Sequence, residues 1–167
     1  MDTARLKTAL LWGLLLTLPC YVLDQWTKRL IVSSLDIGQG FTVIPGFFDI
    51  IHTRNPGAAF SLLQSLPETY RTLFFTGVTL VAFVAVFFVF FKASRASVVL
   101  KLTMSLIVAG AIGNLTDRYL FNEVVDFLSF SVGSFRWPTF NLADTYITLA
   151  MVGLIISSFG QSAKKDL

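Results

Sequence analysis

Four long apolar runs constrain this chain more than any other feature of its sequence. A helix needs roughly 20 mostly apolar residues to cross a hydrocarbon core about 30 Å thick. Stretches of this kind lie at about 8–24, 71–91, 98–116 and 143–161. The chain is 54% hydrophobic and only 14% charged, whereas a soluble domain of this size needs more polar surface. The sequence therefore predicts an integral membrane protein with a single domain over 1–167.

The charged residues divide unequally between the two sides of a membrane crossed four times. Four spans put both termini on one side, together with the basic residues of the short 92–101 loop. Because basic loops are retained in the cytoplasm, both termini are predicted to be cytoplasmic. Of the ten acidic residues, only Asp2 and Asp166 fall on that side. The other acidic residues lie toward the outer face, which indicates where the function is located.

The outer segments, about 28–70 and 119–140, carry signals for a small β-sheet. In "GFTVIPGFFDIIHTRN" two β-prone runs flank Pro45-Gly46, a pair that suits a type II turn. "DFLSFSVGSFRWPTF" predicts a second hairpin around Gly133-Ser134, with a type II′ turn. Apolar residues on one face of the 58–70 segment predict a short interfacial helix. The expected fold is an α-helical membrane protein with four transmembrane helices, a small outer-face β-sheet and a short interfacial helix; ordinary connecting loops are the alternative.

Polar residues gather at the outer ends of the spans. "GNLTDR" (113–118) closes the third span and "FNLADT" (140–145) opens the fourth. Successive spans joined by an outer loop run antiparallel, so these two clusters are expected at the same depth. The residues predicted to converge there are Asp24, Asn55, Asn114, Asp117, Arg118, Asp126, Asn141 and Asp144.

Two of these acids have simple structural explanations. Asp24 lies four residues before Lys28, which is the spacing of an ion pair on one helix face. An unpaired charge near lipid is costly, so Asp117 is expected to pair with a nearby cation such as Arg118 or Arg54.

Asp126 and Asp144 also have alternatives to a chemical role. Asp126 alone suits a solvated turn residue, and Asp144 stands at the N3 position of a helix whose N-cap is Asn141. His52, the only histidine, is interpreted as a surface residue rather than a base. It forms no usual metal-binding spacing with Cys20 and the acids, and no metal is expected.

Considered together, the acids favour catalysis. Two carboxylates close together in a low-dielectric site cannot both ionise easily, so one retains its proton and the pair supplies an acid and a base. The ionised member can activate water while the protonated member polarises a carbonyl, as in aspartic peptidases. A proton-coupled transporter is the main alternative, but such proteins place their acids near the midplane. A structural assembly factor would leave the convergent aspartates without a task.

Five motifs, in order along the chain, carry a resemblance to a known family. They are "LDQWTK" (23–28), "RNPGAAF" (54–60), "GAIGNLTDR" (110–118), "VVDF" (124–127) and "FNLADT" (140–145). The chain resembles the bacterial type II signal peptidases, which are lipoprotein signal peptidases. The resemblance implies an aspartic endopeptidase of the bacterial inner membrane that cuts a precursor just before a cysteine carrying diacylglycerol.

The resemblance also assigns residues and partners. It implies a catalytic pair, Asp126 and Asp144, near the periplasmic face. The motif positions that shape the site or hold substrate are Asp24, Asn55, Gly57, Asn114, Asp117, Arg118, Asn141 and Ala143. The expected partners are lipid-modified precursor proteins and membrane lipid, with no nucleic acid, no metal and no organic cofactor, and the protein is expected to be a monomer.

Overall fold

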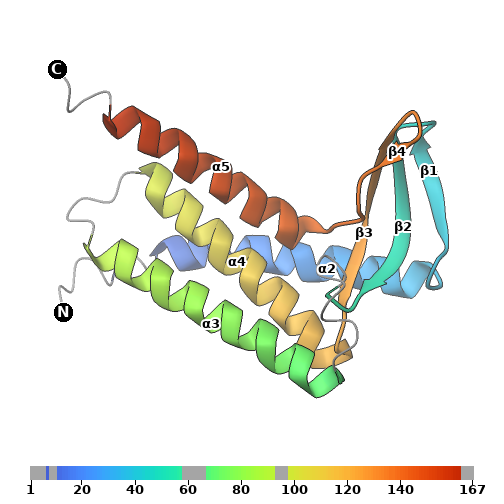
Figure 1. The fold of residues 1–167 in the computed structure, drawn as a ribbon, viewed down its shortest axis with the longest axis horizontal. Helices are drawn as coiled ribbons and strands as arrows, with labels where there is room; N and C mark the ends of the chain where they lie inside the picture. Colours follow the sequence, from blue (N-terminus) through green and yellow to red (C-terminus); the bar gives the residue numbers. More distant parts are fainter. Residues whose placement is uncertain (1–6, 8–10, 58–66, 93–97, 163–167) are drawn as a thin grey trace.

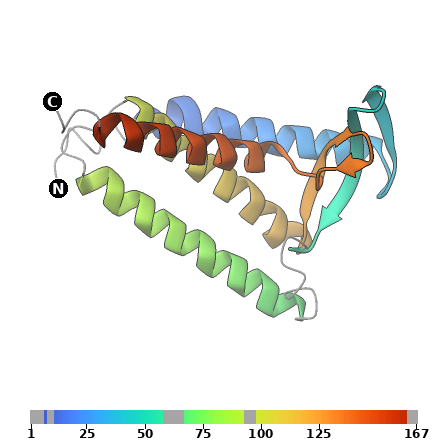
Figure 2. The ribbon, with the colours of Figure 1, turned by 45° about the horizontal axis from the view of Figure 1, so that its top comes forward.

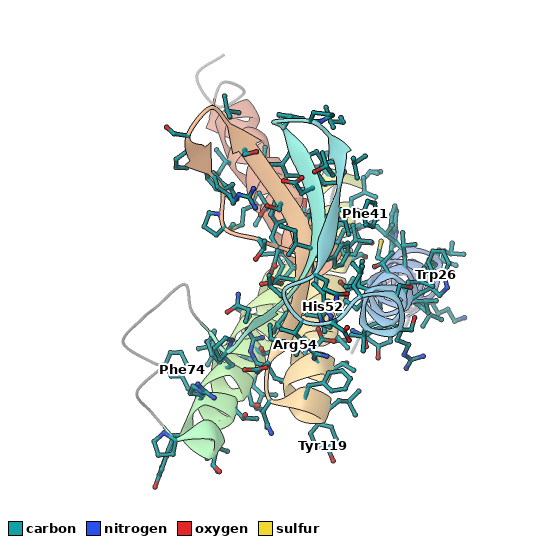
Figure 3. All side chains as sticks on the ribbon, turned by 90° about the vertical axis from the view of Figure 1, so that its right-hand side faces the viewer. Trp26, Phe41, His52, Arg54, Phe74 and Tyr119 are labelled. Carbon is teal, nitrogen blue, oxygen red and sulfur yellow. The ribbon has the colours of Figure 1, made fainter. Side chains whose placement is uncertain are left out.

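The computed structural model describes residues 7, 11–57, 67–92 and 98–162, which form a group of long helices with a β-sheet at one end (Figure 1). The helical elements are η1 (Gly13–Thr17), α2 (Leu18–Ser34), α3 (Glu68–Lys92), α4 (Val98–Phe121) and α5 (Leu142–Ser162). The strands are β1 (Gly40–Ile44), β2 (Phe48–Asn55), β3 (Val124–Val132) and β4 (Phe135–Arg136). Figure 3 views the molecule from the sheet end, where the strands cross in front of the helices.

The described parts of the predicted apolar runs lie in helices. The first span was expected to end near 24, with an outer segment from about 28, and helix α2 continues beyond this predicted end to Ser34. Asp24, which was expected to end the span, is buried within α2 together with Gln25 and Lys28. The side chains of Gln25 and Lys28 bond to residues of α4, so these polar residues hold α2 against its neighbour.

One helix has both the length and the apolar composition of a membrane span among the described residues, namely Val98–Phe121. Thr69–Ala85 and Leu142–Ile155 are shorter apolar helices. The four-span arrangement therefore stays a prediction.

Helix α4 is the centre of the helical group and packs against α2, α3 and α5. Figure 2 shows α3 diverging from α5, with α4 between them. Two glycines of α4 permit the close approach of its neighbours. A Cβ at Gly110 would collide with the backbone oxygen of Ala143, and one at Gly113 would lie 2.5 Å from a carboxylate oxygen of Asp24. The absence of these methyl groups fixes the distance between α4 and the helices that carry acids.

The four strands form one antiparallel sheet in the order β1-β2-β3-β4, and both predicted hairpins are confirmed. The amide of Phe47 donates to the oxygen of Ile44 at 3.0 Å across Pro45-Gly46, and Gly46 has φ +73°, as a type II turn requires. Gly133 has φ +59° in the loop between β3 and β4, as expected for the first central residue of a type II′ turn.

The pairing of β2 with β3 joins the two hairpins and brings distant motifs together. Its register sets Thr53 opposite Asp126 and Asn55 opposite Val124. Strand β3 begins just after α4 because Asn122 adopts φ 59° and its amide bonds the Arg118 oxygen at 2.9 Å, which ends the helix. The short connection holds the end of α4 directly against the sheet.

His52 is buried, so the prediction of a surface position is wrong. Its side chain is only 2% exposed, and Nδ1 lies 2.8 Å from the backbone oxygen of Leu35. Residues Gly38 and Gln39 bond the backbone of His52, so the loop after α2 covers the ring (Figure 3). Most of the predicted interfacial helix, residues 58–66, lies outside the described residues.

Candidate active site

Asp126 and Asp144 meet at the junction of the sheet and the helices, on β3 and in the first turn of α5. Asn141 lies between them. Its Nδ2 donates to Asp126 Oδ1 at 2.7 Å, and its backbone N–H donates to Asp144 Oδ2 at 3.3 Å. One residue therefore holds both carboxylates, which are also close enough for their charges to interact.

The remaining oxygens of the pair accept hydrogen bonds from two further asparagines. Asn55, at the end of β2, donates from Nδ2 to Asp126 Oδ2 at 2.8 Å. Asn114, on α4, donates from Nδ2 to Asp144 Oδ1 at 2.7 Å. Each carboxylate is thus fixed by two N–H donors from different elements, which restricts its rotation and presents both groups in one orientation.

The two alternatives considered for these aspartates have different outcomes. Asp144 does take part in the cap of α5: its backbone N–H donates to Asn141 Oδ1 at 3.0 Å, and its carboxylate accepts the Asn141 backbone N–H, which completes a reciprocal capping box. The cap leaves Asp144 Oδ1 directed to Asn114, so capping and a chemical role are compatible. Asp126 is 1% exposed, so the interpretation as a solvated turn residue is wrong.

The environment of Asp126 favours its protonated form. Burial is the main cause and the neighbouring Asp144 carboxylate is the second; together they raise the pKa of Asp126 from 3.8 to about 7. The hydrogen bonds from Asn55 and Asn141 act in the opposite direction but are outweighed. A carboxyl group with this pKa can hold or release a proton at neutral pH, as a general acid or base must.

A second buried cluster lies behind the pair, centred on the ammonium group of Lys28. Lys28 is 2% exposed, and its Nζ lies 3.0 Å from oxygens of Asp24, Asp117 and Asn114. The predicted pair of Asp24 with Lys28 is confirmed. Asp117 pairs with a cation as expected, but this cation is Lys28 of α2 and not Arg118 or Arg54. Gln25 completes the cluster by donating to both acids.

This cluster also fixes the backbone beside each member of the pair. Asp24 Oδ1 accepts the N–H of Ala143 at 2.9 Å, and Asp117 Oδ2 accepts the N–H of Val125 at 3.0 Å. Ala143 directly precedes Asp144, and Val125 directly precedes Asp126. Asp24 and Asp117 therefore position the backbone next to Asp144 and Asp126, and Ala143 is fully buried at this contact.

Arg118 and Gly57 lie on the side of the site toward α3. The Arg118 guanidinium stacks 4.1 Å above the ring of Phe75 and interacts electrostatically with Asp144 and Asp126. Gly57 is buried with φ +100°, and a Cβ there would meet the same Phe75 ring at 2.6 Å. The N–H of Gly57 donates to Asn55 Oδ1 at 2.9 Å, which orients the Asn55 amide toward Asp126.

All the residues named from the motifs thus belong to one connected site. From the sequence, Lys28 was predicted only as an ion-pair partner of Asp24, and neither Gln25 nor Phe75 was predicted to belong to the site. The helical spacing of Asp24 and Lys28 was the available signal for Lys28, whereas Phe75 lies in an apolar run without any distinguishing mark. Among the described residues, no group of three or more His, Cys, Asp or Glu side chains is arranged to hold a metal ion.

The arrangement has close counterparts among solved structures. Two structures described as bacterial membrane enzymes, at 1.9 Å and 2.3 Å resolution, superimpose with TM-scores of 0.76 and 0.81. They are 33% and 32% identical to this chain and cover 90% and 95% of it, while 92% of each of those chains is matched. The fold, a mostly helical structure with a small antiparallel sheet, is that of a membrane enzyme.

Sequence relatives specify the family. The lipoprotein signal peptidase of Syntrophus aciditrophicus (strain SB) is 40% identical over 145 residues, 87% of this chain and 90% of that protein. The lipoprotein signal peptidase of Staphylococcus carnosus (strain TM300) is 37% identical over 154 residues, 92% of this chain and 94% of that protein. The family described as Signal peptidase (SPase) II matches residues 16–160. The chain belongs to this family of lipoprotein-processing peptidases, as the sequence motifs indicated.

Proposed function

We propose that this protein is an aspartic endopeptidase that removes signal peptides from diacylglyceryl-modified prolipoproteins, cutting just before the lipidated cysteine. Asp126 and Asp144 are the catalytic pair. The observation that carries the proposal is the shared asparagine, Asn141, which bonds both carboxylates and holds them next to each other. No serine, cysteine or histidine takes part in the hydrogen bonds of this pair that the structure describes.

The proposed reaction follows from the different environments of the two acids. Asp126, with its pKa raised to about 7, holds the shared proton before reaction. The Asp144 carboxylate accepts a proton from a water molecule that attacks the carbonyl carbon preceding the modified cysteine. Asp126 donates its proton to the carbonyl oxygen. The tetrahedral intermediate then collapses as the proton on Asp144 passes to the departing amine, and Asp126 recovers its proton from the hydroxyl group.

The residues around the pair support binding of an extended peptide. Arg118 lies at the edge of the pair with its guanidinium on Phe75, and Asn55 lies at the open end of β2. We assign both to the substrate backbone, because N–H donors there can bond peptide carbonyls. The signal helix enters laterally between the spans, with its lipid chains still in the outer leaflet.

The membrane arrangement is part of the same proposal. Four spans near 8–24, 71–91, 98–116 and 143–161 place both termini in the cytoplasm and the sheet on the periplasmic face of the bacterial inner membrane, in a monomer. The acid pair lies on β3 and in the first turn of α5, which meet at the sheet end of the helices (Figure 1), so the site lies at one end of the proposed spans. This location argues against a proton transporter, whose acids lie near the midplane.

The test is cleavage of a diacylglyceryl-modified precursor in proteoliposomes by the parent protein and by Asp126→Asn and Asp144→Asn. We expect each variant to lose at least about 10²-fold in rate. The matched control is Asp49→Asn, which alters a carboxylate on the sheet that is paired with Arg136, away from Asp126 and Asp144. Near-parental cleavage by either dyad variant refutes the catalytic assignment, and cleavage of an unmodified precursor at the same rate refutes the substrate class.

A further inference from the structure

An apolar groove lies between the β3–β4 hairpin and the first turns of α5, in addition to the acid site. It has a volume of about 470 Å³. The hairpin side is formed mainly by aromatic rings, including Phe130, Phe135 and Trp137, and the helix side includes Thr148 and Leu149. The volume lies within the range of roughly 300–1,000 Å³ that is typical of small-molecule sites.

One end of the groove adjoins the catalytic pair. Phe140 and Thr145, which both line it, directly flank the capping segment from Asn141 to Asp144. Thr148 lies one helical turn beyond Asp144 on α5. A molecule that fills the groove therefore has one end beside the segment that carries Asp144.

The walls of the groove suit a hydrocarbon chain. None of its lining residues carries a charge. The hydroxyl of Thr145 already bonds the backbone oxygen of Asn141 at 2.9 Å, so it offers little to a polar ligand. Phe135 and Trp137 are 61% and 57% exposed at the rim. Aromatic rings in that position are typical of the membrane–water interface, where a lipid chain passes from the bilayer into a protein.

We propose that this groove binds one acyl chain of the substrate's diacylglyceryl cysteine. The inference rests on the proposed function, because the diacylglyceryl group is attached to the residue just after the scissile bond. Its chains must therefore leave the site close to Asp144, and the groove is an uncharged path that begins there. Binding of the chain aligns the modified cysteine with the pair, so the groove selects for a long acyl chain.

The test measures cleavage of two precursor peptides that differ only in their acyl chains, palmitoyl in one and butyryl in the other. Thr148→Trp narrows the groove from the helix and Val132→Trp narrows it from the hairpin, where Val132 is 70% exposed. Val152→Trp is the control, since Val152 is 48% exposed on α5 and does not line the groove. We expect the parent to prefer the palmitoyl substrate and each groove variant to lose roughly tenfold of that preference in kcat/KM, chiefly through KM. Val152→Trp keeps the parental preference.

The outcomes separate this inference from the function on which it rests. If the parent cleaves both substrates and the groove variants keep its chain preference, the groove assignment is overturned and the peptidase assignment stands. Equal slowing of both substrates by the groove variants also overturns it, and indicates a bilayer lipid in the groove. If the parent cleaves neither substrate, the proposed function fails and this inference fails with it. Either groove variant is sufficient if the other does not insert into the membrane.

Discussion

Replacing Lys28 with methionine should destabilise the protein strongly, because two acids depend on this one ammonium group. In the parent, Nζ lies 3.0 Å from Asp24 and from Asp117, and all three side chains are almost fully buried. Methionine keeps much of the volume but leaves two buried carboxylates without their cation. Breaking a buried ion pair by removing one partner costs about 3–5 kcal/mol. At roughly 2–4 °C per kcal/mol for a chain of this size, Tm should fall by about 6–20 °C.

Thermal unfolding in detergent, followed by intrinsic fluorescence, measures this effect. Arg29→Met is the control, since Arg29 is the exposed neighbour on the same helix and its loss should change stability by less than about 0.5 kcal/mol. The triple variant Lys28→Met, Asp24→Asn, Asp117→Asn removes the uncompensated charges and should recover most of the lost Tm. A Lys28→Met protein that melts within about 2 °C of the parent, or a triple variant that melts no higher than the single one, refutes the reasoning.

Three further predictions concern the acid pair and its supports. The pKa of Asp126 is about 7 in the folded protein and 3.8 ordinarily, so the parent loses stability as pH rises from about 4 to about 7. Because Asp126→Asn cannot ionise, the Tm of this variant relative to the parent should increase over that interval and level off above it. A difference in Tm that stays constant with pH is the contrary result. Gly110→Ala should lower the free energy of unfolding by about 1–3 kcal/mol and reduce cleavage, because the added methyl group forces α4 away from the Ala143 backbone. Gly77→Ala is the control and should not destabilise the protein, because a Cβ there meets nothing within 4 Å. Equal melting temperatures of the two variants contradict the packing argument. Asn141→Ala removes the cap of α5 and the hydrogen bond to Asp126. The variant should be less stable by about 1–2 kcal/mol and should cleave almost no substrate. Normal turnover by this variant would show that the shared asparagine is dispensable.

The local structure was largely predictable because the signals are local. Pro45-Gly46 and Gly133-Ser134 predict their turns by backbone preference alone, and the spacing of Asn141 and Asp144 predicts the cap of α5. The turns and the cap depend on residues a few positions apart, and the structure agrees with each of them. The convergence of the polar motif residues is a relation between distant segments, and it was predicted because antiparallel spans bring their outer ends to the same depth.

Relations between distant segments were predicted less well. The cation that pairs with Asp117 was not identified, because Lys28 lies on α2 and helix spacing along α2 cannot show which side chains of α4 it meets. His52 was misplaced because the loop that covers it follows a different element. The groove could not be predicted at all, since its walls come from a hairpin and a helix, and the segment that leads into this helix is held to the hairpin by the pairing of Phe140 with Leu128.

The interlocking of α2 with the start of α5 has a consequence for biosynthesis. The carboxylate of Asp24 on α2 accepts the N–H of Ala143, the residue directly before Asp144, so the first turn of α5 is held by a helix more than a hundred residues earlier in the sequence. A ribosome-bound chain that lacks the final helix therefore holds neither the complete pair nor its alignment. Under the proposed function, cleavage is therefore expected only after α5 has been synthesised and has packed against α2.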